Sequence, residues 1–180
     1  MPRLIAFLRA INVGGHTVKM DHLRRLFEGF GLTAVETFIA SGNVSFVTPR
    51  RNLGALEAEI AAGLRAALGY EVATFLRSDA ELADLVAHLP FSPAALAEAA
   101  AFNVAFLGAP VAVPAQRRLL ALRTEVDDFA VRGREVFWLC RLRQSDSTFS
   151  NAVLEKTLGQ PATLRSLKTL QKLSAKYPPA

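Results

Sequence analysis

AVETFIASGNVSFVT, residues 34–48, is the stretch that decides the fold of this chain. Residues 34–40 and 44–48 are two β-type runs, and Ser41-Gly42-Asn43 separates them. Gly-Asn between such runs is typical of a hairpin, because a tight turn needs positive φ. Pro49 ends the second run. The stretch therefore predicts a β-hairpin that turns at 41–43.

The segments on either side of this hairpin complete a split β-α-β unit. Upstream, residues 3–11 (RLIAFLRAI) form a buried strand, and a helix with one apolar face follows from about Met20. Downstream, the sequence predicts a helix over 52–68 and a strand over 71–76. The order β-α-β-β-α-β is that of a ferredoxin-like unit. We therefore expect an α+β protein whose first subdomain, residues 1–77, is ferredoxin-like.

Residues 78–180 are expected to form a second, smaller α+β subdomain packed against the first. Ser78-Asp79-Ala80-Glu81 has the form of a capping box, which predicts a short helix there. The further elements that the sequence predicts are a helical stretch at 94–100, a strand at 102–107, a helix at 116–122, a hairpin over 129–140, and helices at 149–158 and 164–174. This order echoes the first half, but no sequence repeat is apparent, so an internal duplication stays open.

Composition excludes several classes of protein. The chain has 180 residues, of which 51% are hydrophobic, with one cysteine and a formal net charge of +5. This apolar fraction is too high for intrinsic disorder, and one cysteine cannot pair within the chain. Apolar runs fall short of the ~18 residues that a membrane span needs, and the N-terminus lacks a signal-peptide pattern. We expect a soluble, cytoplasmic protein with no membrane partner.

The predicted topology brings two polar loops together. In a β-α-β-β-α-β unit the loop after the first strand and the hairpin turn lie at one edge of the sheet, beside the start of the first helix. A helix start carries unpaired N–H groups and suits an anion. We therefore expect a site for a small anionic or phosphorylated ligand at this edge. Its candidate residues are Arg9, Asn12, Gly14, Gly15, Lys19, Ser41 and Asn43.

Each of these residues also has a purely structural interpretation. The paired glycines can serve a tight turn, and Gly42-Asn43 can serve the hairpin alone. Arg9 can form a structural ion pair or reach solvent at the end of its strand, and His16 can be a solvated loop residue. The sequence leaves these alternatives open.

The basic charge of the chain lies in its last quarter. Residues 132–180 hold nine Lys and Arg against three Asp and Glu, a net charge of +6. Arg165, Lys168, Lys172 and Lys176 fall at i, i+3, i+7 and i+11 of the predicted final helix, opposite a row of leucines. Such a stripe predicts nucleic-acid binding as the alternative function. It is also typical of the polar face of an ordinary amphipathic helix.

Other chemistry leaves little trace in the sequence. The three histidines lack partners at metal-ligand spacing, and the nucleophile-elbow, Walker A and dinucleotide fingerprints do not occur, so we expect no metal and no cofactor. Cys140 lies in an apolar run and is expected to be buried. Whether the protein is an enzyme stays open, as does a structural or assembly role with the last helix pairing with another subunit. The oligomeric state is not predicted.

Several motifs together resemble one family of proteins. They are Leu8-Arg9-Ala10-Ile11-Asn12-Val13-Gly14-Gly15, Lys19-Met20, the segment 38–46 (FIASGNVSF), and the closing segments 150–159 and 162–165. The chain thereby resembles the mostly bacterial domain-of-unknown-function family numbered 1697. The resemblance implies an α+β fold and brings no established activity. Two departures stand out: Ala10 replaces the family's usual glycine, and Arg165-Ser166-Leu167-Lys168-Thr169 replaces its Arg-Asn-Trp-Asn-Thr.

Overall fold

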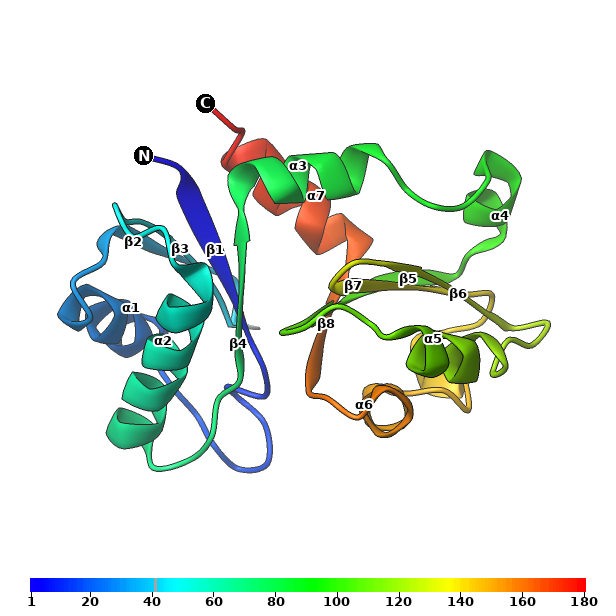
Figure 1. The fold of residues 1–180 in the computed structure, drawn as a ribbon, viewed down its shortest axis with the longest axis horizontal. Coiled ribbons are helices and arrows are strands. Elements are labelled where there is room, and N and C mark those ends of the chain that lie inside the picture. The colour runs from blue at the N-terminus through cyan, green and yellow to red at the C-terminus, as the bar shows by residue number, and fades with distance from the viewer. Residues whose placement is uncertain (41) are drawn as a thin grey trace. The chain divides into compact units, whose positions relative to one another are not determined.

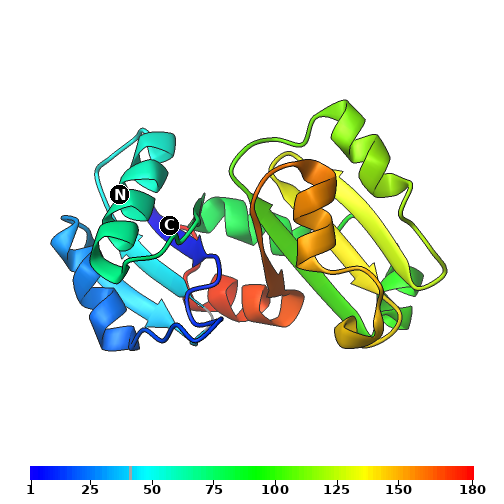
Figure 2. The ribbon, with the colours of Figure 1, turned by 90° about the horizontal axis from the view of Figure 1, so that it is seen from below.

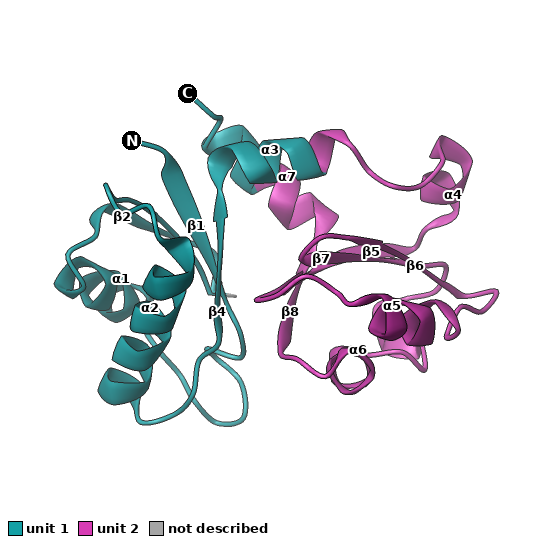
Figure 3. Ribbon diagram, in the orientation of Figure 1, with its two compact units in different colours: residues 1–85, 173–180 teal, residues 86–172 magenta. Residues whose placement is uncertain are grey.

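The computed structural model describes residues 1–40 and 42–180, and it divides the chain into two compact units. Unit 1 comprises residues 1–85 and 173–180, and unit 2 comprises residues 86–172 (Figure 3). The chain therefore leaves unit 1 once and returns to it at the end.

Unit 1 is built on a four-stranded antiparallel sheet with the order β2-β3-β1-β4. Its strands are β1 (Arg3–Leu8), β2 (Thr33–Phe38), β3 (Asn43–Val47) and β4 (Thr74–Ser78). Helices α1 (Met20–Gly29) and α2 (Leu53–Leu68) cover one face of this sheet, and α3 (Asp79–Ala87) follows β4 (Figure 1). β3 is antiparallel to both of its neighbours, so β1 and β2 run in the same direction.

The core of unit 1 follows from the two periodicities of strand and helix. Alternate residues of β1, among them Leu4 and Leu8, point to the face that the helices cover. Leu23 and Phe27 supply the contact from α1, one turn apart, and α2 contributes residues at helical spacing such as Ile60. These side chains are buried and form one apolar cluster, which fixes the ends of the strands where the loops begin.

Unit 2 has a second four-stranded antiparallel sheet, with the order β6-β7-β5-β8. Its strands are β5 (Ala101–Leu107), β6 (Asp127–Arg132), β7 (Glu135–Cys140) and β8 (Ala162–Ser166). Its helices are α4 (Pro93–Glu98), α5 (Val113–Leu120), the 3₁₀ turn η1 (Gln144–Asp146) and α6 (Asn151–Leu158), and α7 (Leu167–Lys176) continues from β8 into the last segment of unit 1. Figure 2 shows α5 and α6 over the same face of this sheet.

The two sheets have the same topology. In each, the first strand of the unit lies between the third and the fourth, and the pairing registers correspond. Leu4 of β1 pairs with Phe46 and Ser78, as Asn103 of β5 pairs with Trp138 and Ser166. When equivalent positions are aligned, LIAFL (4–8) corresponds to NVAFL (103–107). The Leu-Arg-Ser ending of β4 likewise corresponds to that of β8. The second unit thus repeats the strand order of the first.

Three expectations about the elements need correction. β1 ends at Leu8 rather than residue 11, because Ala10 has a φ of 56° and leaves the extended conformation. Residues 162–166 form β8 through pairing with β5, where the sequence predicted the start of the last helix. β4 begins at Thr74 rather than residue 71.

The division of the chain also differs from the expected 1–77 and 78–180. Unit 1 extends to residue 85 because α3 begins directly after β4, at the capping box of Ser78 and Glu81. There the Ser78 N–H donates to Glu81 Oε2 over 2.7 Å, and the Glu81 N–H donates to Ser78 Oγ over 3.1 Å. The capping box itself is as the sequence predicts.

Candidate functional site

The loop after β1 and the β2–β3 hairpin lie in contact, as the topology predicts. Asn12 joins them, because its Nδ2 donates to the Ala40 carbonyl over 2.9 Å. The Leu8 N–H donates to the carbonyl of Gly42 over 2.8 Å. A Cβ on Gly42 would lie 2.7 Å from Ile11 Cγ2, so only glycine allows this close approach. We call residues 9–19 together with 42 and 43 the loop edge.

Asn12 also fixes the path of its own loop. Its Oδ1 accepts a hydrogen bond of 2.7 Å from the Val18 N–H just before α1. The Tyr70 hydroxyl donates to the Ile11 carbonyl over 2.9 Å, and burial raises the pKa of Tyr70. The His16 ring stacks on the Tyr70 ring with the centroids 3.8 Å apart. The contacts of Asn12 and Tyr70 therefore hold the base of the loop edge in place.

The paired glycines form the exposed tip of the loop edge. Gly14 and Gly15 have φ values of 64° and 84°, and the His16 N–H donates to the Val13 carbonyl over 3.1 Å. Positive φ at both central residues is the pattern of a type I′ turn, which glycine adopts without strain. A Cβ at either glycine would meet no described atom within 4 Å. The two glycines therefore form a tight turn, and the space beside them is open.

The charged residues of the loop edge lie at its two ends. Arg9 is half-buried directly after β1, where its N–H donates to the Ala73 carbonyl over 2.9 Å. Lys19 is exposed at the N-cap position of α1, and no side chain of the described residues caps this helix. Asp21, also exposed, lies in the first turn of α1 and adds a negative charge there.

One predicted site residue, Asn43, is buried in the sheet. Asn43 is fully buried, pairs with Phe7 in the sheet, and donates from Nδ2 to the Phe38 carbonyl over 3.0 Å, so it stabilises the hairpin. Ser41 lies outside the described residues. Arg9, Asn12, the two glycines and Lys19 therefore belong to the loop edge by their place in the chain, whereas the Asn43 side chain is buried in the sheet.

The four basic residues predicted for the last helix do not form one exposed stripe, because Arg165 is not on that helix. Arg165 lies in β8 and is 6% exposed, with Nη1 donating to Thr163 Oγ1 over 2.8 Å and to the Leu164 carbonyl over 2.9 Å. Its burial lowers the pKa of Arg165 to about 10. Lys176 is exposed and forms an ion pair with Glu36. Lys168 and Lys172 are the other exposed lysines of α7.

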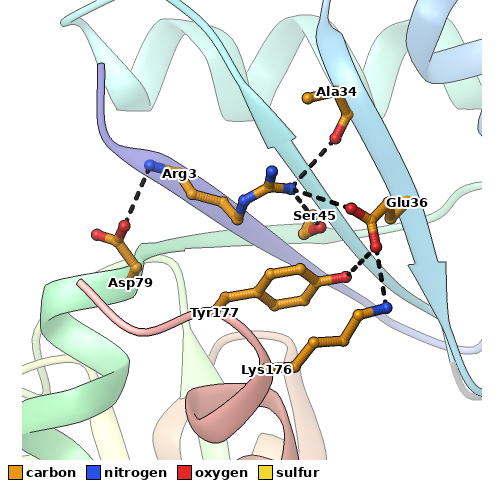
Figure 4. Close-up of polar contacts among 7 residues, drawn as sticks. All are labelled: Arg3, Ala34, Glu36, Ser45, Asp79, Lys176 and Tyr177. Carbon is orange, nitrogen blue, oxygen red and sulfur yellow. Dashed lines mark hydrogen bonds and ion pairs between the residues drawn. The ribbon is translucent and has the colours of Figure 1, made fainter. Parts of the chain in front are cut away.

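Lys176 lies in a polar cluster that no motif of the sequence indicates (Figure 4). Glu36 Oε2 accepts from the Lys176 ammonium over 2.9 Å and from the Tyr177 hydroxyl over 3.0 Å. Hydrogen bonds from Lys176 and Tyr177 lower the pKa of Glu36, and the same contact with Glu36 raises the pKa of Lys176. The Arg3 guanidinium lies 4.8 Å from the Tyr177 ring centre and donates to Ser45 Oγ over 3.0 Å. The cluster binds the C-terminal segment to β1 and β2, and its Tyr177–Glu36 hydrogen bond joins residues 141 positions apart.

A hollow of about 490 Å³ lies elsewhere on unit 1. It is lined by Met1, Pro2, Leu4, Thr48, Pro49, Arg50, Arg51, Leu53 and Ser78. The lining is largely apolar, and the Arg50 guanidinium is held by Glu59. No motif marked these residues, because they come from three separate segments of the chain.

Metal-ligating and nucleophilic groups are scattered. Among residues 1–40 and 42–180, no three His, Cys, Asp or Glu side chains lie together as a metal site. Cys140 is fully buried, as predicted, and burial raises the pKa of its thiol. Within the same residues no helix is both long and apolar enough to cross a membrane.

The fold and the loop edge define a class of α+β protein with two four-stranded antiparallel sheets and, in the described chain, seven helices. The chain belongs to the family described as "Protein of unknown function (DUF1697)", whose sequence model matches residues 1–137. This confirms the resemblance carried by the N-terminal motifs.

A solved structure shares this architecture. It is that of "conserved bacterial protein SP0830 from Streptococcus pneumoniae", with 25% sequence identity and a TM-score of 0.69. The match covers 97% of each chain. No curated protein matches this chain. The comparisons therefore give the family and the fold.

Proposed function

We propose that the loop edge of unit 1 binds a small anionic ligand that carries a phosphate or a similar group. The observation that carries this proposal is the Asn12 hydrogen bond to Ala40, 2.9 Å long, which holds the loop after β1 against the hairpin. Because this contact fixes the loop, its exposed tip is preorganised, and a ligand need not order it on binding.

Three features of the loop edge favour an anion. The Gly14–Gly15 turn leaves its backbone open to a ligand, since no described atom lies within 4 Å of a Cβ position there. Lys19 places an exposed ammonium at the start of α1. The first N–H groups of a helix also attract negative charge, and no described side chain caps them here. Asp21 opposes this attraction and limits the affinity.

Titration with inorganic phosphate tests the proposal, with amide shifts followed by NMR. We expect saturable shifts at Gly14, Gly15 and the first residues of α1. Lys19→Gln should weaken phosphate binding about two- to fivefold, and Asp21→Asn should strengthen it by a similar factor, because each changes one charge at the helix start.

Lys156→Gln is the matched control, since Lys156 is an exposed lysine on α6 of unit 2. It should leave phosphate binding at the loop edge unchanged. Shifts that are spread over both units, or that respond equally to Lys19→Gln and Lys156→Gln, would refute the proposal.

We also infer that unit 1 is a ferredoxin-like unit and that unit 2 is a second one. The strand order β2-β3-β1-β4 with antiparallel pairing between neighbours supports the first assignment. The order β6-β7-β5-β8 with the same pairing supports the second. In both, two helices join the strands in the order β-α-β-β-α-β. A duplication of one ancestral unit would explain the shared Leu-Arg-Ser ending of β4 and β8.

A further inference from the structure

The hollow of about 490 Å³ on unit 1 lies at the start of β1, whereas the loop edge follows the end of that strand. Leu4, Phe46 and Leu76 belong to the apolar cluster that the helices cover. Thr48 and Ser78, which line the hollow with Leu4, follow Phe46 and Leu76 by two residues. Because side chains alternate along a strand, Leu4, Thr48 and Ser78 face the same side of the sheet. The volume is in the range typical of small-ligand sites.

The apolar part of the lining is aliphatic. It is formed by Met1, Pro2, Leu4, Pro49 and Leu53. None of the described lining residues is aromatic, so the hollow offers no ring for a planar group to stack on. An alkyl chain gains free energy from contact with aliphatic side chains, because its apolar area leaves water. The lining therefore suits a flexible aliphatic chain.

A cation and a helix start lie together at the hollow. Arg50 and Arg51 both line it, and the Arg50 guanidinium contacts both carboxylate oxygens of Glu59. Arg51 is exposed, and within the described part of the chain it has no carboxylate partner. α2 begins at Leu53, and no acidic residue lies in its first turn. A guanidinium presents paired N–H groups that match a carboxylate, and the helix start attracts the same charge.

Thr48 is the polar residue in the lining that points to a ligand. It is 3% exposed, and its Oγ1 accepts from the Arg50 N–H over 3.3 Å. Among residues 1–40 and 42–180, no group accepts the Thr48 hydroxyl proton. A buried donor without an acceptor destabilises a fold, and native structures contain few of them. Because Thr48 lines the hollow, an oxygen atom of a ligand there would accept this proton.

The acidic residues nearest to the hollow in sequence contact the backbone. Asp79 and Glu81 follow Ser78 but do not line the hollow. Asp79 accepts from the Arg3 N–H over 3.3 Å, and Glu81 accepts from the Ser78 N–H over 2.7 Å. These contacts leave the Arg51 guanidinium as a charge that lines the hollow and is open to an anion.

Unit 2 has a hollow of about 450 Å³ at the equivalent place, but its chemistry differs. Leu4 pairs with Ser78, and Asn103 pairs with Ser166, so Leu4 and Asn103 are equivalent positions of the two sheets. Asn103 is 6% exposed and donates from Nδ2 to Gln144 Oε1 over 3.1 Å. An aliphatic chain that contacts Leu4 in unit 1 would meet this amide pair in unit 2. We therefore expect such a ligand to bind at unit 1 alone.

We propose that the hollow of unit 1 binds an aliphatic monocarboxylate of medium chain length, such as octanoate. The carboxylate contacts the Arg51 guanidinium and the Thr48 hydroxyl, and the chain lies along Leu4 and Leu53. The site shares no residue with the loop edge, so either proposal can fail without the other.

Titration of the full chain with acetate, butyrate, hexanoate and octanoate tests the proposal, with amide shifts followed by NMR. Octanoate should give saturable shifts at residues 48–54, and the affinity should rise about two- to fourfold with each added methylene group. Arg51→Gln should weaken octanoate binding about three- to tenfold and leave 1-octanol binding unchanged, because only the carboxylate uses the guanidinium. Thr48→Val should weaken octanoate severalfold, and Thr48→Ser, which keeps the hydroxyl, should restore the affinity.

Arg25→Gln is the matched control, because Arg25 is an exposed arginine on α1 that does not line the hollow. It should change nothing, and equal melting temperatures establish that the variants are folded. Absence of saturable shifts at 48–54 up to about 5 mM octanoate overturns the proposal. So does an affinity that is independent of chain length, or an equal response to Arg51→Gln and Arg25→Gln.

Two further outcomes overturn the proposal in favour of a different site or ligand. Octanoate shifts at Gly14 and Gly15 in place of 48–54 would assign the carboxylate to the loop edge. Binding to phosphatidylglycerol vesicles without any binding of free octanoate would assign the hollow to a lipid surface.

Discussion

Ala10 adopts a left-handed backbone conformation, with a φ of 56°. A Cβ is close to the following carbonyl in this conformation and costs about 1 kcal/mol, whereas glycine has no Cβ. The angle therefore favours glycine at this position. We predict that Ala10→Gly raises the free energy of unfolding by about 0.5–1 kcal/mol, measured by denaturant titration.

The same substitution at Ala58 is the control. Ala58 is exposed on α2 and helical, so Ala58→Gly should lower the free energy of unfolding by about 0.5–1 kcal/mol. A destabilising effect of Ala10→Gly, with the same sign as the control, would show that strain at Ala10 does not limit the fold.

Glu36 gives the stability a dependence on acid pH. Its pKa in the folded protein is below the ordinary value, chiefly because Lys176 and then Tyr177 donate to its carboxylate. A lowered pKa contributes stability above the unfolded value, near pH 4, that is lost as the pH falls through the folded value. The Glu36 side chain is 46% exposed, so the contribution stays below about 1 kcal/mol.

We therefore predict that Glu36→Gln lowers the melting temperature at pH 7 by a small amount. The difference from the natural chain should shrink as the pH falls below about 4, where the carboxylate becomes protonated. Tyr177→Phe keeps the Lys176 ion pair and should keep most of this pH dependence. A difference between Glu36→Gln and the natural chain that is constant from pH 3 to about 7 would contradict the role of the charge.

At the scale of the elements, the capping box of α3 is a feature that the sequence predicts and the structure contains. Ser78 Oγ accepts from the Glu81 N–H, and Glu81 Oε2 accepts from the Ser78 N–H. We predict that Ser78→Ala lowers the free energy of unfolding by about 1 kcal/mol, because a helix N–H loses its acceptor. Glu81→Gln keeps an acceptor and should cost clearly less. Equal losses in the two variants, measured by chemical denaturation, would disprove the reciprocal cap.

Strand β8 shows why local pattern is insufficient for some elements. Leucines three residues apart are typical of a helix face, and the spacing of Leu164, Leu167, Leu170 and Leu173 predicts a helix that begins at 164. The strand exists because Leu164 pairs with Ala105, about 60 positions earlier, and no local signal carries that pairing. Because Arg165 lies in this strand and is buried, it is not part of an exposed stripe on the last helix.

The candidate site was predictable to the extent that topology determines it. The order of strands alone brings the loop after β1 to the hairpin, and the contact of Asn12 with Ala40 is in accord with that expectation. The sequence does not reveal that Asn43 faces the sheet, because donation to Phe38 depends on the hairpin register. Nor does it reveal the hollow at Asn103, whose lining residues are brought together by pairing across the second sheet.

For the whole molecule, the repeated topology is the property that is least visible in the sequence. The similarity of segments 4–8 and 103–107 becomes apparent only when the strand registers identify Leu4 and Asn103 as equivalent positions. The shared residues are small in number because each sheet constrains only its buried positions, while loops and exposed faces vary freely. The sequence predicts the pattern β-α-β-β-α-β in the first half. In the second half it predicts a helix where β8 lies, so the same pattern is not recognisable there.

The return of the chain to unit 1 makes its last segment part of that unit's stability. Leu173 and Tyr177 are 1% and 6% exposed, and burial of each large apolar side chain contributes about 1.5–3 kcal/mol. We predict that deletion of Leu173–Ala180 lowers amide protection in β1 and β2 by hydrogen exchange, whereas β6 and β7 keep theirs. Deletion of residues 178–180, which are exposed, should have no such effect. Equal loss of protection in both sheets would instead mean that the two units unfold together, because exchange would then report a single cooperative transition.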